Sequence, residues 1–334
     1  MDTIDRRQFL KSALAIATAT GLSLMDIEKL AAASMGRMPK PNRYNPKGLP
    51  TAILGRTGVE IPRMVLGLGS RFCHIDSDEE AYEMLEYALD NGFYYWDTAH
   101  AYDNTLALPA GKPKPTRLVR SEERVGVVVR RRRKEIFLST KVSSRNPDAA
   151  KAEIEDSLKT LGTDHLNMLM IHSVNSMDDV REMSQKGHLI DVVRSMKEQK
   201  VCDFIGFSGH ADAFALKAMA DTGFFDNMLV AMNQWDYQHL SPREEVAIPA
   251  AKAQNMGVLL MKLVRPKENK GLSIPDLIRY AMNIPGPDAV CVGMDSLAVV
   301  KSNLEILRNF KPYTPEEMSY WNEILGPFYR SDKI

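Results

Sequence analysis

Four side chains that can transfer or hold a proton follow three apolar segments of the sequence. The run FYYWDTAHAY at residues 93–102 reads as a buried strand that ends in Asp97, with Tyr102 five residues further on. Two more apolar runs, EIFLSTKV and LNMLMIHSV, place Lys141 and His172. Side chains at or just after the carboxyl ends of successive strands gather at one face of a parallel barrel, which is where such folds build active sites.

These residue types suit acid–base chemistry on a carbonyl. An ammonium group stabilises a nearby phenolate, so Lys141 is expected to lower the pKa of Tyr102 and make the phenol a useful proton donor. Each residue alone has a structural alternative, because Asp97 could cap a turn, Tyr102 could be a loop aromatic and His172 could be a core residue. Their occurrence together, each near a strand end, favours a proton-transfer site.

The elements that must position these side chains alternate regularly along the chain. From Thr51 onward, strand-like and helix-like segments recur eight times over roughly 250 residues, the size of a (β/α)8 TIM barrel. The first strand is expected at 61–69 and the first helix at 77–92, with Ser77 as its cap. We therefore predict an α/β fold, a TIM barrel over residues 51–330. A doubly wound sheet is less favoured, because VLGLGSRF lacks the third glycine of GxGxxG.

The ordered set Asp97, Tyr102, Lys141 and His172 resembles the catalytic tetrad of the aldo-keto reductases. The resemblance covers about residues 51–310 and implies an NAD(P)(H)-dependent oxidoreductase that transfers hydride between the cofactor and a small carbonyl or alcohol substrate. The resemblance implies that Tyr102 of this chain protonates the carbonyl oxygen and that Lys141 stabilises the tyrosinate. Asp97 would hold Lys141 in place, and His172 would orient the carbonyl.

The same resemblance implies a site for NADPH or NADH. Gly-Ser after the first strand, Ser and Gln at later strand ends and a Met-Lys pair at the seventh strand match family positions, the last typical of one branch. The expected cofactor residues are Gly69, Ser70, Ser208, Gln234, Met261, Lys262, Arg265, Gly293, Met294 and Asn303. Many members carry a Lys and an Arg where this chain has Gly293 and Val299, so the preference between the two cofactors stays open.

The first residues resemble a targeting segment rather than part of the barrel. DRRQFLK at 5–11 is similar to the twin-arginine export motif, and the following apolar stretch is too short to span a membrane. We expect a signal peptide at 1–33, a linker at 34–50 and export to the periplasm by the twin-arginine machinery. The alternatives are an amphipathic helix that stays attached and, if the signal is not used, a cytoplasmic protein.

Composition excludes some classes of partner. Lys and Arg total 43 and so do Asp and Glu, which leaves no net field to hold nucleic acid or an anionic membrane. The sequence has three cysteines without CxxC spacing, so we expect neither a metal site nor a disulfide framework.

Two other functions stay open at this point. A non-catalytic nicotinamide-binding sensor or regulatory subunit could use the same barrel. A metal-dependent hydrolase built on His172, His210 and His239 is less favoured, because no HxH or HxxE spacing supports it. The segment from Asp103 to Arg120 is an insertion directly after Tyr102; it is expected to form either a lid that favours anionic substrates or a surface excursion.

Overall fold

Eight parallel strands close into a barrel in the computed structural model, in the order β10–β3–β4–β5–β6–β7–β8–β9. The structure describes residues 43–106, 115–210, 212–232, 243–264 and 272–329. The barrel strands are β3 Met64–Gly67, β4 Tyr95–Asp97, β5 Phe137–Val142, β6 Leu166–Val174, β7 Cys202–Gly209, β8 Asn227–Ala231, β9 Gly257–Met261 and β10 Ala289–Gly293. Helices cover their outer side, which explains why each strand is a nearly continuous apolar run. The predicted TIM barrel is confirmed.

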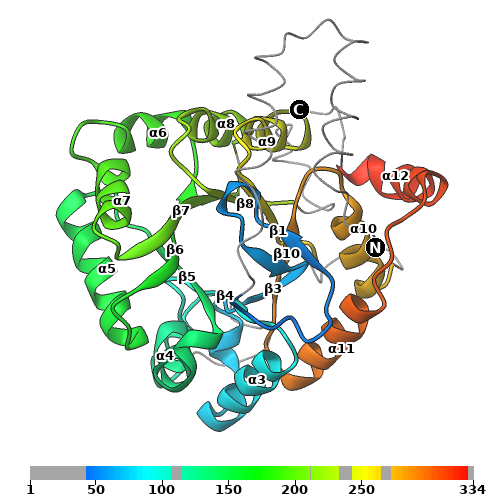
Figure 1. Ribbon diagram of the computed structural model, residues 1–334, viewed down its shortest axis with the longest axis horizontal. Helices are drawn as coiled ribbons and strands as arrows, with labels where there is room; N and C mark the ends of the chain where they lie inside the picture. The colour runs from blue at the N-terminus through cyan, green and yellow to red at the C-terminus, as the bar shows by residue number, and fades with distance from the viewer. Residues whose placement is uncertain (1–42, 107–114, 211, 233–242, 265–271, 330–334) are drawn as a thin grey trace, which may run out of the picture. The chain divides into compact units, whose positions relative to one another are not determined.

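A helix follows each barrel strand and packs outside it, as Figure 1 shows. The helices are α3 Asp78–Asp90, α4 Ser121–Arg132, α5 Pro147–Leu161, α6 Met177–Met183, α7 Leu189–Glu198, α8 Ala213–Asp221, α9 Ile248–Ala253, α10 Ile274–Asn283, α11 Leu297–Arg308 and α12 Pro315–Tyr329. The described residues also form three short 3-10 turns, η1 Gly55–Thr57, η2 Phe72–His74 and η3 Arg133–Glu135, and a π-helical turn η5 Arg243–Ala247. The predicted cap of the first helix is present, since the Ser77 side chain accepts a hydrogen bond from the Glu80 amide.

The strand predicted at 61–69 is wrong in its extent, because the chain divides it between two sheets. Residues 60–62 form β2 (Glu60–Pro62), which pairs antiparallel with β1 (Thr51–Ile53), and the barrel strand β3 begins only at Met64. Pro62 has no N–H to donate to a ladder, which suits the end of a short hairpin strand. The apolar run is continuous across the break, so periodicity alone could not reveal it.

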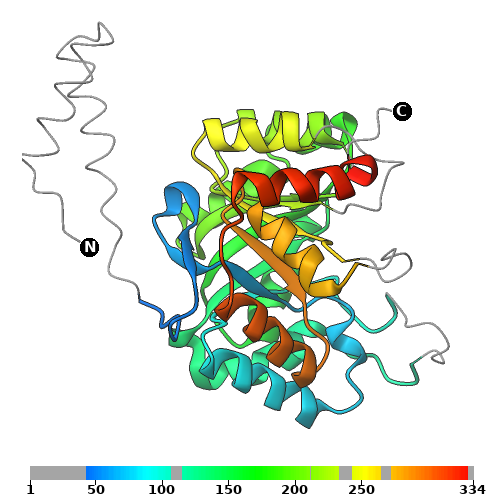
Figure 2. The ribbon, with the colours of Figure 1, turned by 90° about the vertical axis from the view of Figure 1, so that its right-hand side faces the viewer.

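This β1–β2 hairpin lies against the amino ends of the barrel strands (Figure 2). The Tyr94 hydroxyl donates to the Glu60 carbonyl at 2.8 Å, just before β4 begins. The Arg56 amide donates to the Asn255 carbonyl at 2.6 Å, just before β9. Gly55 comes so close that a Cβ there would lie 2.2 Å from the Gly257 amide nitrogen, and its φ is +44°. The hairpin therefore lies at the amino end of the barrel, and it does not cover the carboxyl ends of the strands, where a functional site is expected.

The linker predicted at 34–50 ends earlier than expected. Tyr44 and Leu49 are buried, and the Tyr44 ring stacks on Tyr94 with centroids 5.0 Å apart. The Asn167 side-chain amide also donates to the Tyr44 hydroxyl at 3.1 Å. Residues 43–50 therefore belong to the barrel unit, whereas the predicted signal peptide and residues 34–42 lie outside the described part of the chain. Within that part, no helix is both long and apolar enough to cross a membrane.

Candidate functional site

The barrel brings the four predicted proton-transfer residues together at the carboxyl ends of β4, β5 and β6. Asp97 is the last residue of β4, and Lys141 and His172 lie near the ends of β5 and β6. β4 pairs with β5, and β5 pairs with β6, so these strand ends are neighbours. Tyr102 lies in the connection after β4, where its amide donates to the Ala99 carbonyl at 3.1 Å in a tight turn.

Lys141 is the centre of this arrangement. Its buried ammonium group donates to Asp97 Oδ2 at 2.6 Å, to the Thr98 carbonyl at 2.7 Å and to the Tyr102 hydroxyl at 3.4 Å. Burial opposes the charge most strongly, but the Asp97 carboxylate and the Tyr102 oxygen together more than offset burial and raise the pKa of Lys141 above its ordinary value. The side chain therefore stays a cation next to the phenol.

Asp97 is itself held by groups that the sequence did not single out. The Ser139 hydroxyl donates to Asp97 Oδ1 at 3.2 Å. The thiol of Cys291, on β10, contacts Asp97 Oδ2 at 3.9 Å. Both carboxylate oxygens are thus engaged, which fixes the orientation of the group that holds Lys141. Neither partner carried a signal in the sequence beyond its place in an apolar strand.

The pKa of Tyr102 differs from the expected direction. Burial raises it above its ordinary value, and the Lys141 ammonium, which acts in the opposite direction, offsets only part of that effect. The expectation of a lowered pKa is therefore wrong for the net shift and right for the contribution of Lys141. The phenol keeps its proton at neutral pH, next to a cation that would stabilise the tyrosinate.

The His172 imidazole lies next to the phenol ring of Tyr102. The two rings meet edge to face, with centroids 5.4 Å apart. Burial, together with the positive charge of Lys141, lowers the pKa of His172 to about 3, so the imidazole is neutral at physiological pH. Its Nδ1 atom lies 3.1 Å from the Ser143 hydroxyl, a contact that the sequence did not reveal. A neutral imidazole can donate one hydrogen bond to a carbonyl without competing as an acid.

The predicted cofactor residues lie at the carboxyl ends of other strands of the same barrel. Gly69 and Ser70 lie in the turn after β3, which ends at Gly67. Ser208 lies on β7, where its hydroxyl accepts from the Ser173 amide at 3.0 Å. That hydroxyl keeps its own proton to donate. Met261 ends β9 in a buried position, and the exposed Lys262 follows in the left-handed region with φ of 62°. Gln234 and Arg265 lie outside the described residues.

The end of β10 and the following helix have features that fit the adenosine end of a dinucleotide. A Cβ at Gly293 would meet no atom of the described residues within 4 Å, so this part of the structure leaves the strand end open there. Met294 is fully buried, and its amide donates to the Gly67 carbonyl at 3.1 Å. The Asn303 side chain on α11 is buried, and within the described ranges its Nδ2 atom has no hydrogen-bond partner. A buried donor without a partner is rare in proteins and is expected where a ligand supplies the acceptor.

The insertion after Tyr102 is closed at its base. Residues Asp103 and Arg120 form an antiparallel bridge, and the Ser121 amide donates to the Tyr102 carbonyl at 2.9 Å. The buried Asn104 side chain donates to the Arg117 carbonyl at 2.8 Å and accepts from the Val119 amide at 3.0 Å. The excursion therefore leaves and returns beside Tyr102 through a small hydrogen-bonded neck, which we call the insertion neck (residues 102–104 and 117–121).

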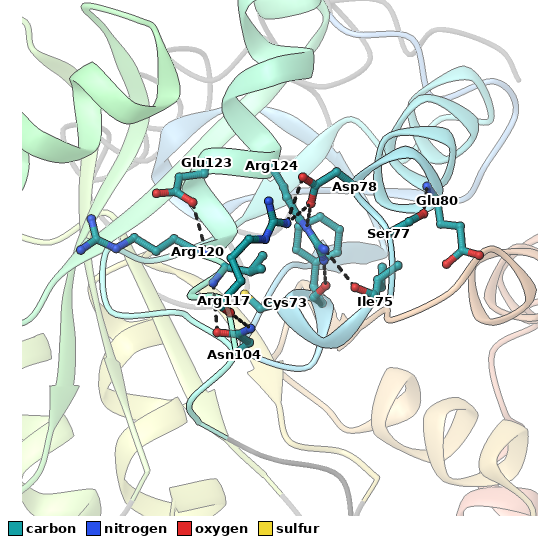
Figure 3. Close-up of polar contacts among 12 residues, drawn as sticks. Cys73, Ile75, Ser77, Asp78, Glu80, Asn104, Arg117, Arg120, Glu123 and Arg124 are labelled. Atoms are coloured by element: carbon teal, nitrogen blue, oxygen red, sulfur yellow. Dashed lines mark hydrogen bonds and ion pairs between the residues drawn. The ribbon is translucent and has the colours of Figure 1, made fainter. Parts of the chain in front are cut away.

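An ion cluster ties the insertion neck to α3 and α4 (Figure 3). The carboxylate of Asp78 accepts from the Arg117 guanidinium at 2.9 Å and from Arg124 at 3.0 Å. Arg124 is almost fully buried and also donates to the carbonyls of Phe72 and Ile75. Arg120 lies 3.8 Å from Asp156. The described basic residues of the insertion thus face protein carboxylates, which weakens the expectation that they attract an anionic substrate; Lys112 and Lys114 lie outside the described residues.

The described residues show no group of three or more side chains suited to bind a metal ion. The three cysteines are buried and free, two of them in barrel strands. His239, one ligand of the hydrolase alternative, lies outside the described part of the chain.

Comparisons with known proteins agree with this geometry. Residues 63–266, more than half of the chain, match the model of the aldo/keto reductase family. The uncharacterized oxidoreductase YrpG of Bacillus subtilis is 29% identical over 228 residues, which are 62% of this chain and 64% of YrpG. Human aldo-keto reductase family 1 member C2 is 25% identical over 160 residues, 43% of this chain and 44% of that protein. The matches thus span less than two thirds of these relatives.

Solved structures share the fold. The holo form of an aldo-keto reductase from Bacillus halodurans has a TM-score of 0.65 at 18% identity, covering 85% of this chain and 97% of that one. An aldo-keto reductase from Klebsiella pneumoniae in complex with NADPH also has a TM-score of 0.65 at 18% identity, covering 86% of this chain and 97% of that one. At these identities the likeness shows the barrel architecture.

Proposed function

We propose that this chain, which belongs to the aldo/keto reductase family, is an NAD(P)H-dependent oxidoreductase that reduces a carbonyl or oxidises the corresponding alcohol. The observation that carries the proposal is the buried Lys141 ammonium, 2.6 Å from the Asp97 carboxylate and 3.4 Å from the Tyr102 hydroxyl. A phenol next to a fixed cation can give up its proton while the negative charge that develops on it is stabilised.

Tyr102 acts as the general acid in the reducing direction. Its raised pKa keeps the proton in place until a carbonyl oxygen gains negative charge, and the phenol O–H bond then breaks as the new alcohol O–H bond forms. Lys141 stabilises the resulting tyrosinate, and Asp97 keeps the ammonium in position. Solvent returns a proton to the phenol after the alcohol leaves.

His172 orients the substrate. Because burial keeps the imidazole neutral, its N–H donates a hydrogen bond to the carbonyl oxygen and does not deliver a second proton. Its edge-to-face contact with the Tyr102 ring places the two donors side by side. Together they would hold the oxygen between a hydrogen-bond donor and an acid.

The residues at the other strand ends would hold the cofactor, which supplies a hydride to the carbonyl carbon when bound. The strand end at Gly293 and the buried Asn303 amide, which has no hydrogen-bond partner among the residues that the structure describes, support a site for its adenosine portion. The Ser208 hydroxyl, which accepts from the Ser173 amide, can donate its proton to the carboxamide of the nicotinamide. Met261, at the end of β9, would supply a polarisable thioether beside the nicotinamide ring, as in the family branch with Met-Lys at this strand.

We propose weak discrimination between NADPH and NADH. Gly293 and Val299 provide no cation for the 2′-phosphate of NADPH, and each charge-assisted hydrogen bond to phosphate is worth roughly 1.5–3 kcal/mol. Titrations with both cofactors test this, and a strong preference for NADPH would show that another basic residue supplies the charge.

Export by the twin-arginine route to the periplasm remains part of the proposal, supported by the DRRQFLK motif. Replacing Arg6 and Arg7 by Lys should retain the protein inside cells that possess the pathway. Equal amounts of the wild type and of the Lys variant in the periplasmic fraction would contradict export by this route.

The proposed activity can be tested directly with purified protein. Aldehydes and quinones are offered with NADPH or NADH while the absorbance of the reduced nicotinamide is followed. Oxidation of the cofactor that depends on the carbonyl supports the proposal. Tight cofactor binding without turnover of any substrate would instead favour the non-catalytic sensor.

A further inference from the structure

The Ser143 side chain contacts His172 from the connection after β5. Its Oγ atom lies 3.1 Å from His172 Nδ1. A hydroxyl can donate or accept, and a neutral imidazole carries a proton on only one of its two nitrogens. The direction of this one hydrogen bond therefore decides which nitrogen of His172 is the donor.

Ser143 is held rigidly by its backbone. Its amide donates to Glu153 Oε2 at 2.7 Å, and its carbonyl accepts from Arg145 Nη1 at 3.1 Å. Arg145 also donates to the Ser173 carbonyl at 2.9 Å, the residue directly after His172. The connections after β5 and β6 are thus joined beside the imidazole, and the backbone that carries the Ser143 hydroxyl is held next to His172.

The Arg145 guanidinium is fixed in turn. It forms an ion pair with Asp179 on α6 through two hydrogen bonds, Nε to Oδ1 at 2.7 Å and Nη2 to Oδ2 at 2.9 Å. The Asp179 carboxylate also accepts from the Asn175 amide at 3.0 Å. A donor supported by such a second layer of contacts keeps its geometry through a reaction.

We propose that Ser143 is a positioning residue that donates its hydroxyl proton to Nδ1 of His172 and thereby keeps the imidazole proton on Nε2, where it can reach a carbonyl oxygen. This inference rests on the proposed function for its catalytic consequence. Ser143 is not one of the four residues of the tetrad pattern. The neutral state of His172 makes the choice of nitrogen matter, because an imidazolium would donate from both.

The tautomer can be measured without any substrate. Protein with 15N-labelled histidine is examined by two-bond 1H–15N correlation NMR, which distinguishes Nδ1–H from Nε2–H, and the His172 signals are identified by their loss in His172→Gln. We expect Nε2–H in the wild type and in Ser143→Thr, which keeps the hydroxyl. In Ser143→Ala we expect a mixture or Nδ1–H. Ser144→Ala is the matched control, because the Ser144 amide shares the Glu153 carboxylate but its hydroxyl does not take part in the contact with Nδ1.

Kinetics provide the second readout. Loss of one orienting hydrogen bond should lower kcat of Ser143→Ala by about 3- to 10-fold with little change in cofactor affinity, and Ser143→Thr should recover most of it. An Nδ1–H proton in the wild type, or an unchanged tautomer in Ser143→Ala, would overturn the positioning role. If the chain reduced no carbonyl but its tautomer still followed Ser143, the positioning would stand and the proposed activity would fail.

Discussion

At the scale of single residues, the charge on Lys141 depends on its three partners. An ammonium group in the interior is strongly unfavourable unless it is paired and hydrogen-bonded. Here one carboxylate, one carbonyl and one phenol take its three donors. The same contacts aim the charge at the Tyr102 oxygen, where negative charge would develop during proton transfer. Stability and function thus depend on the same buried pair.

Lys141→Met should therefore be destabilising as well as inactive. The change leaves the buried Asp97 carboxylate without its cation, and breaking a buried ion pair from one side costs about 3–5 kcal/mol. Urea unfolding followed by circular dichroism measures the loss. The double variant Asp97→Asn/Lys141→Met removes both charges and should recover part of it. A Lys141→Met protein as stable as the wild type would show that the Asp97 carboxylate does not need the Lys141 cation for stability.

The depressed pKa of His172 predicts a pH dependence of stability. The folded protein protonates this imidazole only near pH 3, whereas the unfolded chain does so near its ordinary pKa of about 6.5. Between these values the unfolded state binds more protons, so the group's contribution is complete above pH 6.5 and declines as the pH falls, by up to about 1.4 kcal/mol per unit.

His172→Gln should remove this contribution, so its free energy of unfolding should fall less steeply than that of the wild type across the same window. Urea unfolding at several pH values gives both slopes. Parallel curves for the two proteins would mean that His172 titrates normally in the folded state.

The sequence could predict that Asp97, Lys141 and His172 lie close together, but not the contacts that support them. Asp97, Lys141 and His172 stand out because a polar residue ends an apolar run. Ser143 lies in a polar segment where serine carries no signal, and its contact with His172 depends on how two connections meet. The net shift in the pKa of Tyr102 was predicted in the wrong direction because burial, which outweighs the nearby ammonium, is a property of the fold.

At the scale of elements, the connection after β4 does two tasks. It holds Tyr102 in a tight turn, and it carries an insertion that leaves and returns within the insertion neck. Closing a loop costs little more as it lengthens, so the excursion can be long without disturbing the turn. Because the neck is hydrogen-bonded and tied to Asp78, the insertion is fixed relative to the phenol at its base. We propose that it shapes substrate choice from this position.

Asn104→Ala should loosen the neck. It removes two hydrogen bonds and leaves the Arg117 carbonyl and the Val119 amide without their partner, a loss of roughly 1–3 kcal/mol. We expect a higher KM for the carbonyl substrate and an unchanged dissociation constant for the cofactor. Thr105→Ala is a suitable control. Thr105 follows Asn104 directly, and its hydroxyl donates an exposed hydrogen bond to Asp103 that this change removes. Equal KM values for Asn104→Ala and the wild type would leave the insertion without a role in substrate binding.

Element boundaries were harder to predict than element types. The helix at 77–92 was recognised because Ser77 and Gly92 mark its ends, and the structure places it at Asp78–Asp90. The run at 61–69 offered no such marks inside it, and the chain uses it for both a hairpin strand and a barrel strand. Tyr44 looked like part of a polar linker because its partners, Tyr94 and Asn167, are distant in the sequence.

At the scale of the whole barrel, eight strands place residues from distant segments at one face. The repeated alternation of strand and helix, together with a first turn that lacks the third glycine of GxGxxG, favours this architecture over a doubly wound sheet. The order of strands then brings Asp97, Lys141 and His172 together without further information. Details that depend on long connections, such as the surroundings of Gln234 and Arg265, remain predictions.

The most direct test of the central claim is the rate of hydride transfer in a single turnover by Tyr102→Phe. Without the phenolic proton, the rate should fall by about 10² to 10⁴, the usual contribution of a positioned general acid, while NADPH binding measured by fluorescence stays the same. Tyr320→Phe, which changes an exposed tyrosine on α12, should transfer hydride at the wild-type rate. Wild-type transfer by Tyr102→Phe would contradict the assignment of Tyr102 as the acid and with it the proposed mechanism.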